Sequence, residues 1–208
     1  MNETNPRTVI WDATAPRHLA LAGALDVLVA VTGLRVPRIV ANPLEPYGED
    51  LLITDPDALS EVSSAEWHFL RKFRQKNDLA DFERAERLAA VRKHRQLVVV
   101  DLDESEHDDF EVFASETFTR KHALIAPLGR GERAAIAVAC NRQWTAGLDD
   151  GAARRVAGGL GVTVTTTQQL LMTATAEGHL SEAEADDLYR RLLEGGLYGP
   201  PDLHDETT

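Results

Sequence analysis

The sequence predicts an α/β protein whose mainly parallel sheet is covered by helices on both faces. Short runs of apolar and β-branched residues alternate with helical patterns along the chain, which is typical of βαβ units. One run, LVVVDL at 97–102, is apolar almost throughout, as expected of a strand that is buried on both faces. With 208 residues, 43% of them hydrophobic and 27% charged, the chain fits one globular domain over residues 1–208.

The first quarter of the chain predicts strands around one helix. TVIWD at 8–12 is typical of a short buried strand, and it ends in an aspartate. A helix is expected over 15–33, because a proline suits its first turn and a glycine suits its end. RVPRIV at 35–40 and LLIT at 51–54 are candidate strands, and the proline-containing stretch between them is a loop.

The middle of the chain predicts a helical insertion over residues 60–96, with two amphipathic helices. Its charge is unusual. Residues 71–95 hold nine Lys and Arg against four Asp and Glu, a net charge of +5, whereas the whole chain carries −12. A basic segment on an acidic body is more informative than the total charge.

The second half of the chain alternates helices with short strands. The last helix is expected to begin at Ser181, because Ser181 and Glu184 have the spacing of a capping box. Residues 200–208 are expected to form a flexible tail. The other expected elements are helices over 108–118, 131–143, 149–161 and 168–178, and strands over 145–148 and 162–167.

Composition bounds the location of the protein. The longest apolar runs are far too short to cross a membrane, and the N-terminal MNETNPR lacks the apolar segment of a secretory signal. The single cysteine, Cys140, excludes an intramolecular disulfide and a cysteine-rich zinc site, and its apolar neighbours predict a buried position. We therefore expect a cytoplasmic protein with no membrane partner.

Four acidic residues stand where a parallel sheet would bring them together. Asp12 ends the first strand, Asp149 and Asp150 follow a later one, and Glu132 lies in the first turn of the helix between. In an open parallel sheet, ligands bind beyond the carboxyl ends of the strands. Packed carboxylates repel one another unless a cation joins them, so this set predicts a Mg²⁺ or Mn²⁺ site.

Each acid also has an ordinary structural interpretation. Asp12 suits a helix N-cap, and Glu132 in a first turn favours the helix dipole. Asp149 and Asp150 together suit a turn followed by an N-cap. The metal-site hypothesis therefore depends on the combination of the four residues.

Two stretches of the chain resemble the PIN-domain family, in its prokaryotic branch of predicted nucleic-acid-binding proteins. The first is LGRGERAAIAVACNRQWTAGLDDGAARRVAGGLGVTVTTT at 128–167, and the second, weaker one is TVIWDATAPRHLALAGALDVL. The resemblance extends over about 7–40 and 120–200, by comparison with the family's motifs. It implies a three-layer α/β/α fold and cleavage of single-stranded RNA with Mg²⁺ or Mn²⁺.

The resemblance also assigns residues and partners. Asp12 matches the family's first acidic ligand, Glu132 the acid that opens the long helix, and Asp149 and Asp150 the acidic pair. Thr165 and Thr166 fall near a polar position that supports such sites. Many family members are toxins of toxin–antitoxin pairs and dimers are common, so the resemblance implies an antitoxin protein and a homodimer as partners.

The sequence departs from the family pattern at two places. The family usually carries a further acid after the second strand, where this chain has Pro43. Glu45 is two residues late, so the ligand is absent, replaced by Glu45, or supplied by the acids at 49–50. The family also places a small hydroxyl residue directly after its first acid, and here Thr14 is one position off.

If the site cleaves RNA, basic residues must meet the phosphates. The insertion is the expected source, with Trp67 or Phe73 as a stacking surface. The same residues also fit a solvated helix face over a core. Arg130, Arg154 and Arg155 lie beside the acids in the sequence, where they either contact phosphate or pair with the acids. The basic residues proposed for the RNA groove are Arg71, Lys72, Arg74, Arg92, Lys93 and Arg95.

Two alternatives to a nuclease stay open. LVVVDLDES resembles the motif of haloacid-dehalogenase-type phosphatases, with Asp101 as nucleophile and Asp103 as acid, although that motif normally lies near the start of its domain. The other alternative is a catalytically degenerate PIN-like module that binds RNA or a protein without cleavage. An acidic body would suit a basic protein partner.

Overall fold

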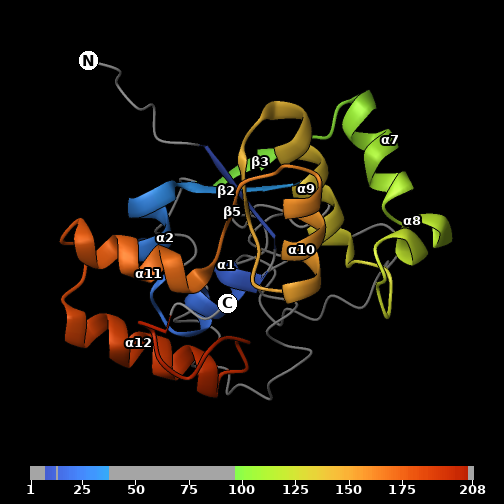
Figure 1. Cartoon of the computed structure of the whole chain (residues 1–208). Coiled ribbons are helices and arrows are strands. Elements are labelled where there is room, and N and C mark those ends of the chain that lie inside the picture. The colour runs from blue at the N-terminus through green and yellow to red at the C-terminus, as the bar shows by residue number, and fades with distance from the viewer. Residues whose placement is uncertain (1–7, 13, 38–96, 206–208) are drawn as a thin grey trace, which may run out of the picture.

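The computed structural model describes residues 8–12, 14–37 and 97–205 (Figure 1). The candidate strand at 51–54 and the helical insertion predicted over 60–96 lie outside these residues. Within the described part, short parallel strands alternate with helices, as the sequence predicts.

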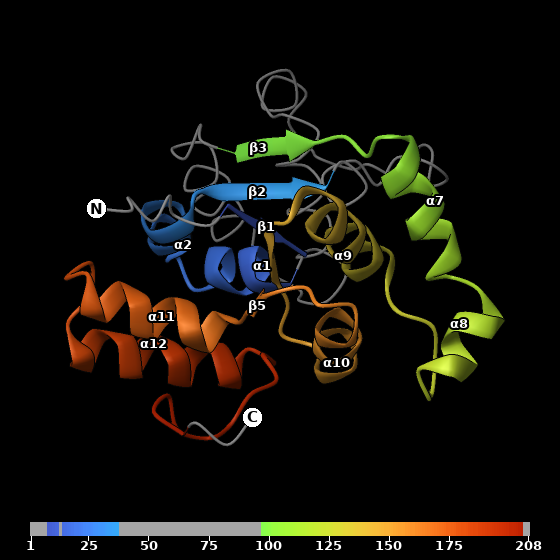
Figure 2. The ribbon, with the colours of Figure 1, turned by 45° about the horizontal axis from the view of Figure 1, so that its top comes forward.

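Parallel strands form the centre of the molecule. One sheet has the order β1-β4-β5 and a second pairs β2 with β3, and all pairings are parallel. Because β1 and β2 lie against each other, the spatial order is β3-β2-β1-β4-β5 (Figure 2). The strands are β1 (Val9–Trp11), β2 (Leu34–Pro37), β3 (Leu97–Val100), β4 (Thr145–Gly147) and β5 (Val164–Thr165).

Helices cover both faces of this sheet, which makes three layers (Figures 1 and 2). Alternate residues of β1 enter different cores: Val9 and Trp11 pack with one group of helices, and Ile10 packs with the other. The first group is α1 (Thr14–Leu21), α2 (Leu25–Thr32), α11 (Thr167–Ala176) and α12 (Glu182–Glu194). The second is α7 (Glu104–Val112), α8 (Glu116–Lys121), α9 (Arg130–Arg142) and α10 (Gly151–Gly159).

The single helix expected over 15–33 is two helices. α1 ends at Leu21, and Gly23 has a φ of +70°, which only glycine adopts easily. The N–H of Ala24 donates to the carbonyl of Leu19, and the N–H of Ala22 to that of His18, so the chain closes α1 before α2 starts. The expected helix end at Gly33 is confirmed.

Other boundaries differ from the expectation where a side chain caps a helix. The helix expected over 108–118 is α7 followed by α8, and α7 begins early because Asp103 forms a capping box with Glu106. The strand expected over 162–167 stops at Thr165, because Thr166 caps α11. The capping box at Ser181 and Glu184 is confirmed.

Cys140 was expected to be buried and is exposed, because it lies after the buried stretch of α9.

The C-terminal segment packs against α11 and α12. Leu203 is buried, and its carbonyl accepts a hydrogen bond from Gln168. The hydroxyl of Tyr189 donates to the carbonyl of Pro200. Residues 200–205, which we expected to belong to a flexible tail, are instead held against the two helices. No helix in the described ranges is long and apolar enough to span a membrane.

Candidate active site

The candidate site lies at the carboxyl ends of β1 and β4. These strands are neighbours in the sheet, and the strand order reverses between them, because the chain runs from β1 toward β2 on one side and later adds β4 and β5 on the other. Ligands of open α/β sheets bind at such a reversal. The N–H of Asp12 donates to the carbonyl of Gly147 at 3.1 Å, so the strand pairing continues to the first acid.

Close packing between Trp11 and Gly147 fixes the ends of these two strands. The two residues face each other in the β1–β4 register. A Cβ atom on Gly147 would lie 2.1 Å from the Trp11 ring, so only glycine fits. The indole N–H of Trp11 donates to the hydroxyl of Thr32 in α2, which holds the buried ring in place. The tight packing of the two strand ends therefore limits the movement of the backbone that carries Asp12 and Asp149.

Asp12 is buried and is held by Thr14 at the start of α1. Only 3% of Asp12 is exposed. The N–H of Thr14 donates to Oδ1 at 2.9 Å, and the Thr14 hydroxyl donates to Oδ2 at 3.0 Å. Each carboxylate oxygen retains a further lone pair for another partner. The orientation of this carboxylate is therefore set by a helix start, which also fits the N-cap interpretation.

Asp149 is held in the same way by Thr167 at the start of α11. It is 7% exposed, and Thr167 is completely buried. The N–H of Thr167 donates to Oδ1 at 2.8 Å, and its hydroxyl donates to Oδ2 at 2.7 Å. Each of the two buried acids thus accepts two hydrogen bonds from one threonine in the first turn of a helix.

The pKa values of both buried acids are raised, because their ionised forms are unfavourable in this site. Burial, the charge of Asp149 and the charge of Glu132 together raise the pKa of Asp12 from 3.8 to about 7, although the bonds from Thr14 act in the opposite direction. Burial also raises the pKa of Asp149, against the hydrogen bonds from Thr167 and the positive charge of Arg154. A site that would keep both groups ionised at neutral pH therefore needs a positive partner.

Glu132 lies near the pair but is already engaged. It lies in the first turn of α9, and its Oε2 accepts from the N–H of Gly129 at 2.7 Å. Its charge is felt by Asp12, so the two lie in one electrostatic environment. Glu132 therefore acts on Asp12 through its charge, although it joins no cluster of three acids within the described residues.

Asp150 has a different position from Asp149. It is exposed and is the N-cap of α10, where its Oδ1 accepts from the N–H groups of Ala152 and Ala153. Of the two threonines expected to support the site, Thr165 lies in β5 and Thr166 caps α11. The contact to Asp149 comes from Thr167, the next residue. The Thr166–Gln169 spacing, which the sequence-based prediction did not use, is that of a capping box and would have placed Thr167 at a helix start.

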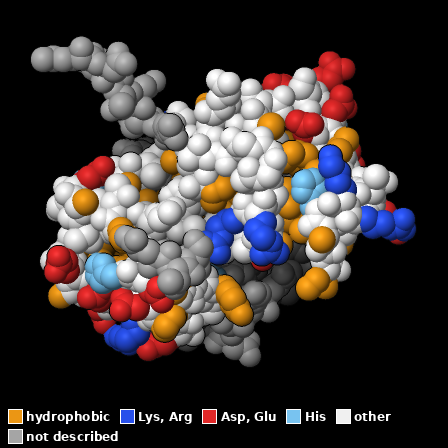
Figure 3. Space-filling model, in the orientation of Figure 1, with side chains coloured by type: hydrophobic (Ala, Val, Ile, Leu, Met, Phe, Trp, Pro, Cys, Tyr) orange, Lys and Arg blue, Asp and Glu red, His pale blue; other side chains and the backbone are white. Residues whose placement is uncertain are grey.

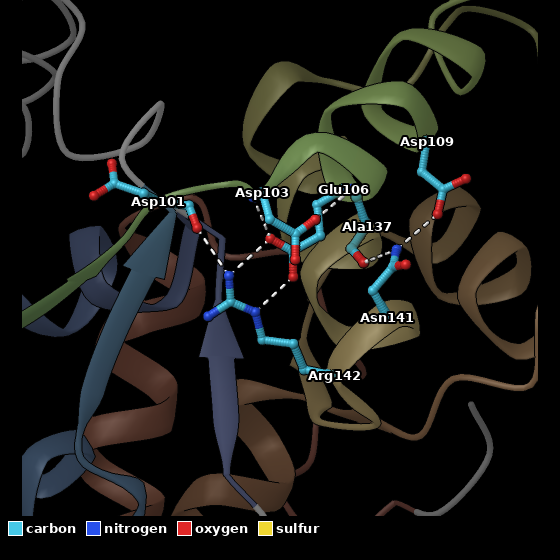
Figure 4. Close-up of polar contacts among 7 residues, drawn as sticks. All are labelled: Asp101, Asp103, Glu106, Asp109, Ala137, Asn141 and Arg142. Carbon is cyan, nitrogen blue, oxygen red and sulfur yellow. Dashed lines mark hydrogen bonds and ion pairs between the residues drawn. The ribbon is translucent and has the colours of Figure 1, made fainter.

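The alternative acids, Asp101 and Asp103, follow β3, which β2 separates from β1 in the order of the described strands. Figure 4 shows both acids near Glu106 and Arg142. Asp103 caps α7, and the carbonyl of Asp101 accepts from Arg142 at 2.8 Å. The same guanidinium binds both oxygens of the completely buried Glu106. This network joins α7 to α9 and gives Asp103 a structural role.

Several predicted site residues lie outside the described residues. They are Glu45, the acids at 49–50, the aromatic residues Trp67 and Phe73, and the basic residues Arg71, Lys72, Arg74, Arg92, Lys93 and Arg95. Of the remaining arginines, Arg130 and Arg155 are exposed, and Arg154 is half-buried beside Asp149. Among these three, Arg154 is the one whose charge acts on the candidate site.

The chemistry of the donor set fits a hard divalent cation. Within the described part of the chain, no three or more His, Cys, Asp and Glu side chains gather as a ready-made metal cage. Mg²⁺ seldom requires one, because it keeps several waters and binds through one or two carboxylates together with substrate phosphates. Two buried carboxylates with a raised pKa, each oriented by a threonine, provide that number of ligands.

The fold and the site define a three-layer α/β protein with paired carboxylates at the point where the strand order reverses. The family model DUF3368, described as a PIN domain, matches residues 103–208, just over half of the chain. The chain therefore belongs to the PIN-domain family, which places it among nuclease-like proteins. No curated protein and no solved structure matches it. The matched range includes Glu132, Asp149 and Thr167, whereas Asp12 precedes it.

Proposed function

We propose that the protein is a Mg²⁺- or Mn²⁺-dependent nuclease that hydrolyses phosphodiester bonds in single-stranded RNA at the Asp12–Asp149 pair. One observation carries this proposal. Two carboxylates follow neighbouring parallel strands and are almost completely buried, and burial together with mutual repulsion raises the pKa of Asp12 to about 7. Such an arrangement is unfavourable without a cation and typical of a functional site.

The residues divide the work as follows. Asp12 and Asp149 would hold the metal ion, and Thr14 and Thr167 would fix the direction of their oxygens. Glu132 would add negative charge at the periphery and orient water. A bound divalent ion supplies Lewis-acid stabilisation of the phosphate and a more acidic water. Asp150, as a helix cap, is proposed to support the fold and not the metal.

The finer biological role follows from the family resemblance. A toxin of a toxin–antitoxin pair, with an antitoxin protein, a homodimer and a cytoplasmic location, remains the expectation from the sequence. The basic residues between 71 and 95 remain the expected source of phosphate contacts outside the described residues. The charge distribution supports this expectation. The residues outside 71–95 carry a net charge of −17, so the protein needs a local basic surface to bind the phosphates of RNA.

A second function is favoured by one observation. Glu132 already accepts the N–H of Gly129, and the described acids form no cluster of three. A PIN-like module that binds RNA or a protein without cleaving it would also have this arrangement. The two functions differ in whether the bound RNA is cut.

Cleavage of a fluorescent single-stranded RNA in Mn²⁺ tests the proposal. We expect cleavage by the full chain, none in EDTA, and a loss of at least 100-fold in the Asp12→Asn and Asp149→Asn variants, because each removes a charged metal ligand. Asp150→Asn is the matched control, since asparagine is also a good N-cap. It should retain activity. RNA binding without any metal-dependent cleavage would instead support the non-catalytic module.

A further inference from the structure

A shallow pocket lies directly beside Asp149, and the C-terminal segment builds its outer wall. The lining residues used below are Asp149, Arg154, Gln168, Tyr189, Tyr198 and Gly199. They come from the loop after β4, from α10, α11 and α12, and from the segment that follows α12. Because Asp149 is one of its lining residues, the pocket adjoins the candidate active site.

The wall is rigid. Gln168 donates to the carbonyls of Leu203 at 2.7 Å and Asp205 at 2.9 Å. The Tyr189 hydroxyl donates to the carbonyl of Pro200 at 3.0 Å, and a Cβ atom on Gly199 would lie 2.4 Å from that hydroxyl oxygen. These contacts fix the backbone on the C-terminal side of Tyr198.

Tyr198 projects from this rigid wall into solvent. Its side chain is 92% exposed, although its neighbour Leu197 is buried at 6%. The three large hydrophobic side chains that are exposed in the described residues are Val112, Ile125 and Tyr198, and Tyr198 is the aromatic one and the one that lines this pocket. A fixed backbone that presents an exposed aromatic ring gives a platform on which a planar group is able to stack.

Positively and negatively charged side chains both act on groups that line the pocket. The backbone N–H of Arg154 donates to the carbonyl of Asp150, but its guanidinium forms no hydrogen bond or ion pair with any described residue, while its charge acts on Asp149. The carboxylate of Asp149 acts on Tyr189, and those of Asp202 and Asp205 act on it as well, so the surroundings of this tyrosine are negative. Figure 3 shows a compact group of Lys and Arg side chains near the middle of this face, apart from the acidic side chains over α12. An anionic phosphate fits beside the positive Arg154, and a neutral base fits against the ring of Tyr198.

We propose that this pocket is a nucleotide subsite in which a base of the single-stranded substrate stacks on Tyr198 while Arg154 contacts the adjoining phosphate. The inference rests on the proposed function, because it assigns the pocket to the same nucleic acid. It adds a binding determinant in the C-terminal segment, independent of the basic residues between 71 and 95. The tyrosine contributes through the face of its ring and the arginine through its charge.

Fluorescence anisotropy of the full chain in EDTA tests the subsite without cleavage. The probes are a fluorescein-labelled decauridylate and a labelled abasic oligomer with the same number of phosphates. Tyr198→Ala should weaken decauridylate binding about five- to 100-fold, since stacking contributes that much per base. It should leave the abasic oligomer unchanged. Tyr198→Phe should bind like the wild type, because the ring remains.

Two variants serve as controls. Ile125→Ala removes another exposed apolar side chain outside the pocket and should leave binding unchanged. Arg154→Gln should weaken both oligomers, and it should reduce the slope of log affinity against log salt concentration by about 0.7, the value for one phosphate contact on a single strand.

Equal binding of decauridylate by Tyr198→Ala and the wild type would overturn the subsite, and so would undetectable binding by the wild type. An equal loss for the abasic oligomer would overturn stacking, since that probe has no bases. These results are separate from the fate of the nuclease proposal. Metal-dependent cleavage with no effect of Tyr198→Ala refutes the subsite alone, whereas Tyr198-dependent binding without any cleavage refutes the nuclease alone.

Discussion

Thr167 donates both its backbone N–H and its hydroxyl to Asp149, at 2.8 and 2.7 Å, and thereby joins the start of α11 to the end of β4. Thr14 makes the same pair of contacts to Asp12 at the start of α1. The repeated arrangement fixes the two buried carboxylates relative to the sheet. It also supplies hydrogen bonds that partly offset the loss of water around each charge.

Thr167→Val removes the hydroxyl donor and keeps the shape of the side chain. We expect the free energy of unfolding at pH 8 to fall by about 1–3 kcal/mol, because the Asp149 oxygen then has one fewer partner in a buried position. Urea denaturation measures the change. Thr173→Val is the control on the same helix, because its hydroxyl is exposed and bonds only to its own helix. A similar loss in both variants would contradict a special role for Thr167.

Asp12 makes the stability of the metal-free protein depend on pH. Its pKa is about 7 in the folded state and near 3.8 when unfolded, so it contributes stability that is complete below about pH 4 and is lost as pH rises through 7. The full range corresponds to about 4 kcal/mol. We expect urea unfolding in EDTA to show a marked loss of stability between pH 5 and 8.

The Asp12→Asn variant isolates this effect. Asparagine has no charge to bury, so the variant should lose most of the pH dependence and be more stable than the wild type at pH 8. Asp26→Asn, at an exposed position in the first turn of α2, should keep the pH profile of the wild type. An Asp12→Asn profile as steep as that of the wild type would show that other groups cause the dependence.

Gly147→Ala tests the contact that positions the strand ends. The new methyl group would meet the buried Trp11 ring at 2.1 Å, so the ring or the strand must move. We expect a loss of about 3 kcal/mol in the free energy of unfolding, at the high end for overpacked cores. Gly158→Ala in α10 has open space around its Cβ and should be neutral or stabilising by up to about 1 kcal/mol. Thermal or urea denaturation of both variants decides the matter.

Arg142→Ala leaves the completely buried Glu106 without its charged partner. Among the described groups, the N–H of Asp103 would be the remaining donor to Glu106, so we expect a loss of about 3–5 kcal/mol in the free energy of unfolding at neutral pH. Arg190→Ala breaks two ion pairs on the surface of α12 and should change stability by at most about 1 kcal/mol. Equal effects of the two variants would mean that the burial of Glu106 is unimportant.

The sequence was sufficient for the alternation of strands and helices and for the position of Asp12 and Asp149 at the ends of strands. Asp12 directly follows β1 and Asp149 lies two residues after β4. Parallel pairing places strand ends at one edge of the sheet, so local patterns together with one topological rule place both acids at that edge. The strand expected at 97–102, which is β3 and ends at Val100, and the capping box at Ser181 were equally local signals. These features depend on periodicity and capping, which act within a few residues.

The sequence was insufficient where a shift of one residue in a helix start changes which side chain is buried. Asp149 and Asp150 both follow β4, and only the start of α10 at Gly151 makes Asp150 the cap and leaves Asp149 for the site. The same shift separates Thr166 from Thr167. The break at Gly23 was missed because a glycine inside an apolar periodic pattern costs a helix only about 1 kcal/mol, which tertiary packing easily overrides. Tyr198 has no local signal, because its exposure results from contacts made by distant residues.

The thermal melting temperature of the full chain in increasing Mn²⁺ tests the central claim most directly. A metal that binds only the folded protein should raise the melting temperature by about 5–10 °C when its concentration reaches 100 times its Kd. We predict that Asp149→Asn abolishes this rise and that the neighbouring Asp150→Asn retains it. No rise in the wild-type chain, or an equal rise in the Asp149→Asn variant, would contradict a metal site at the Asp12–Asp149 pair.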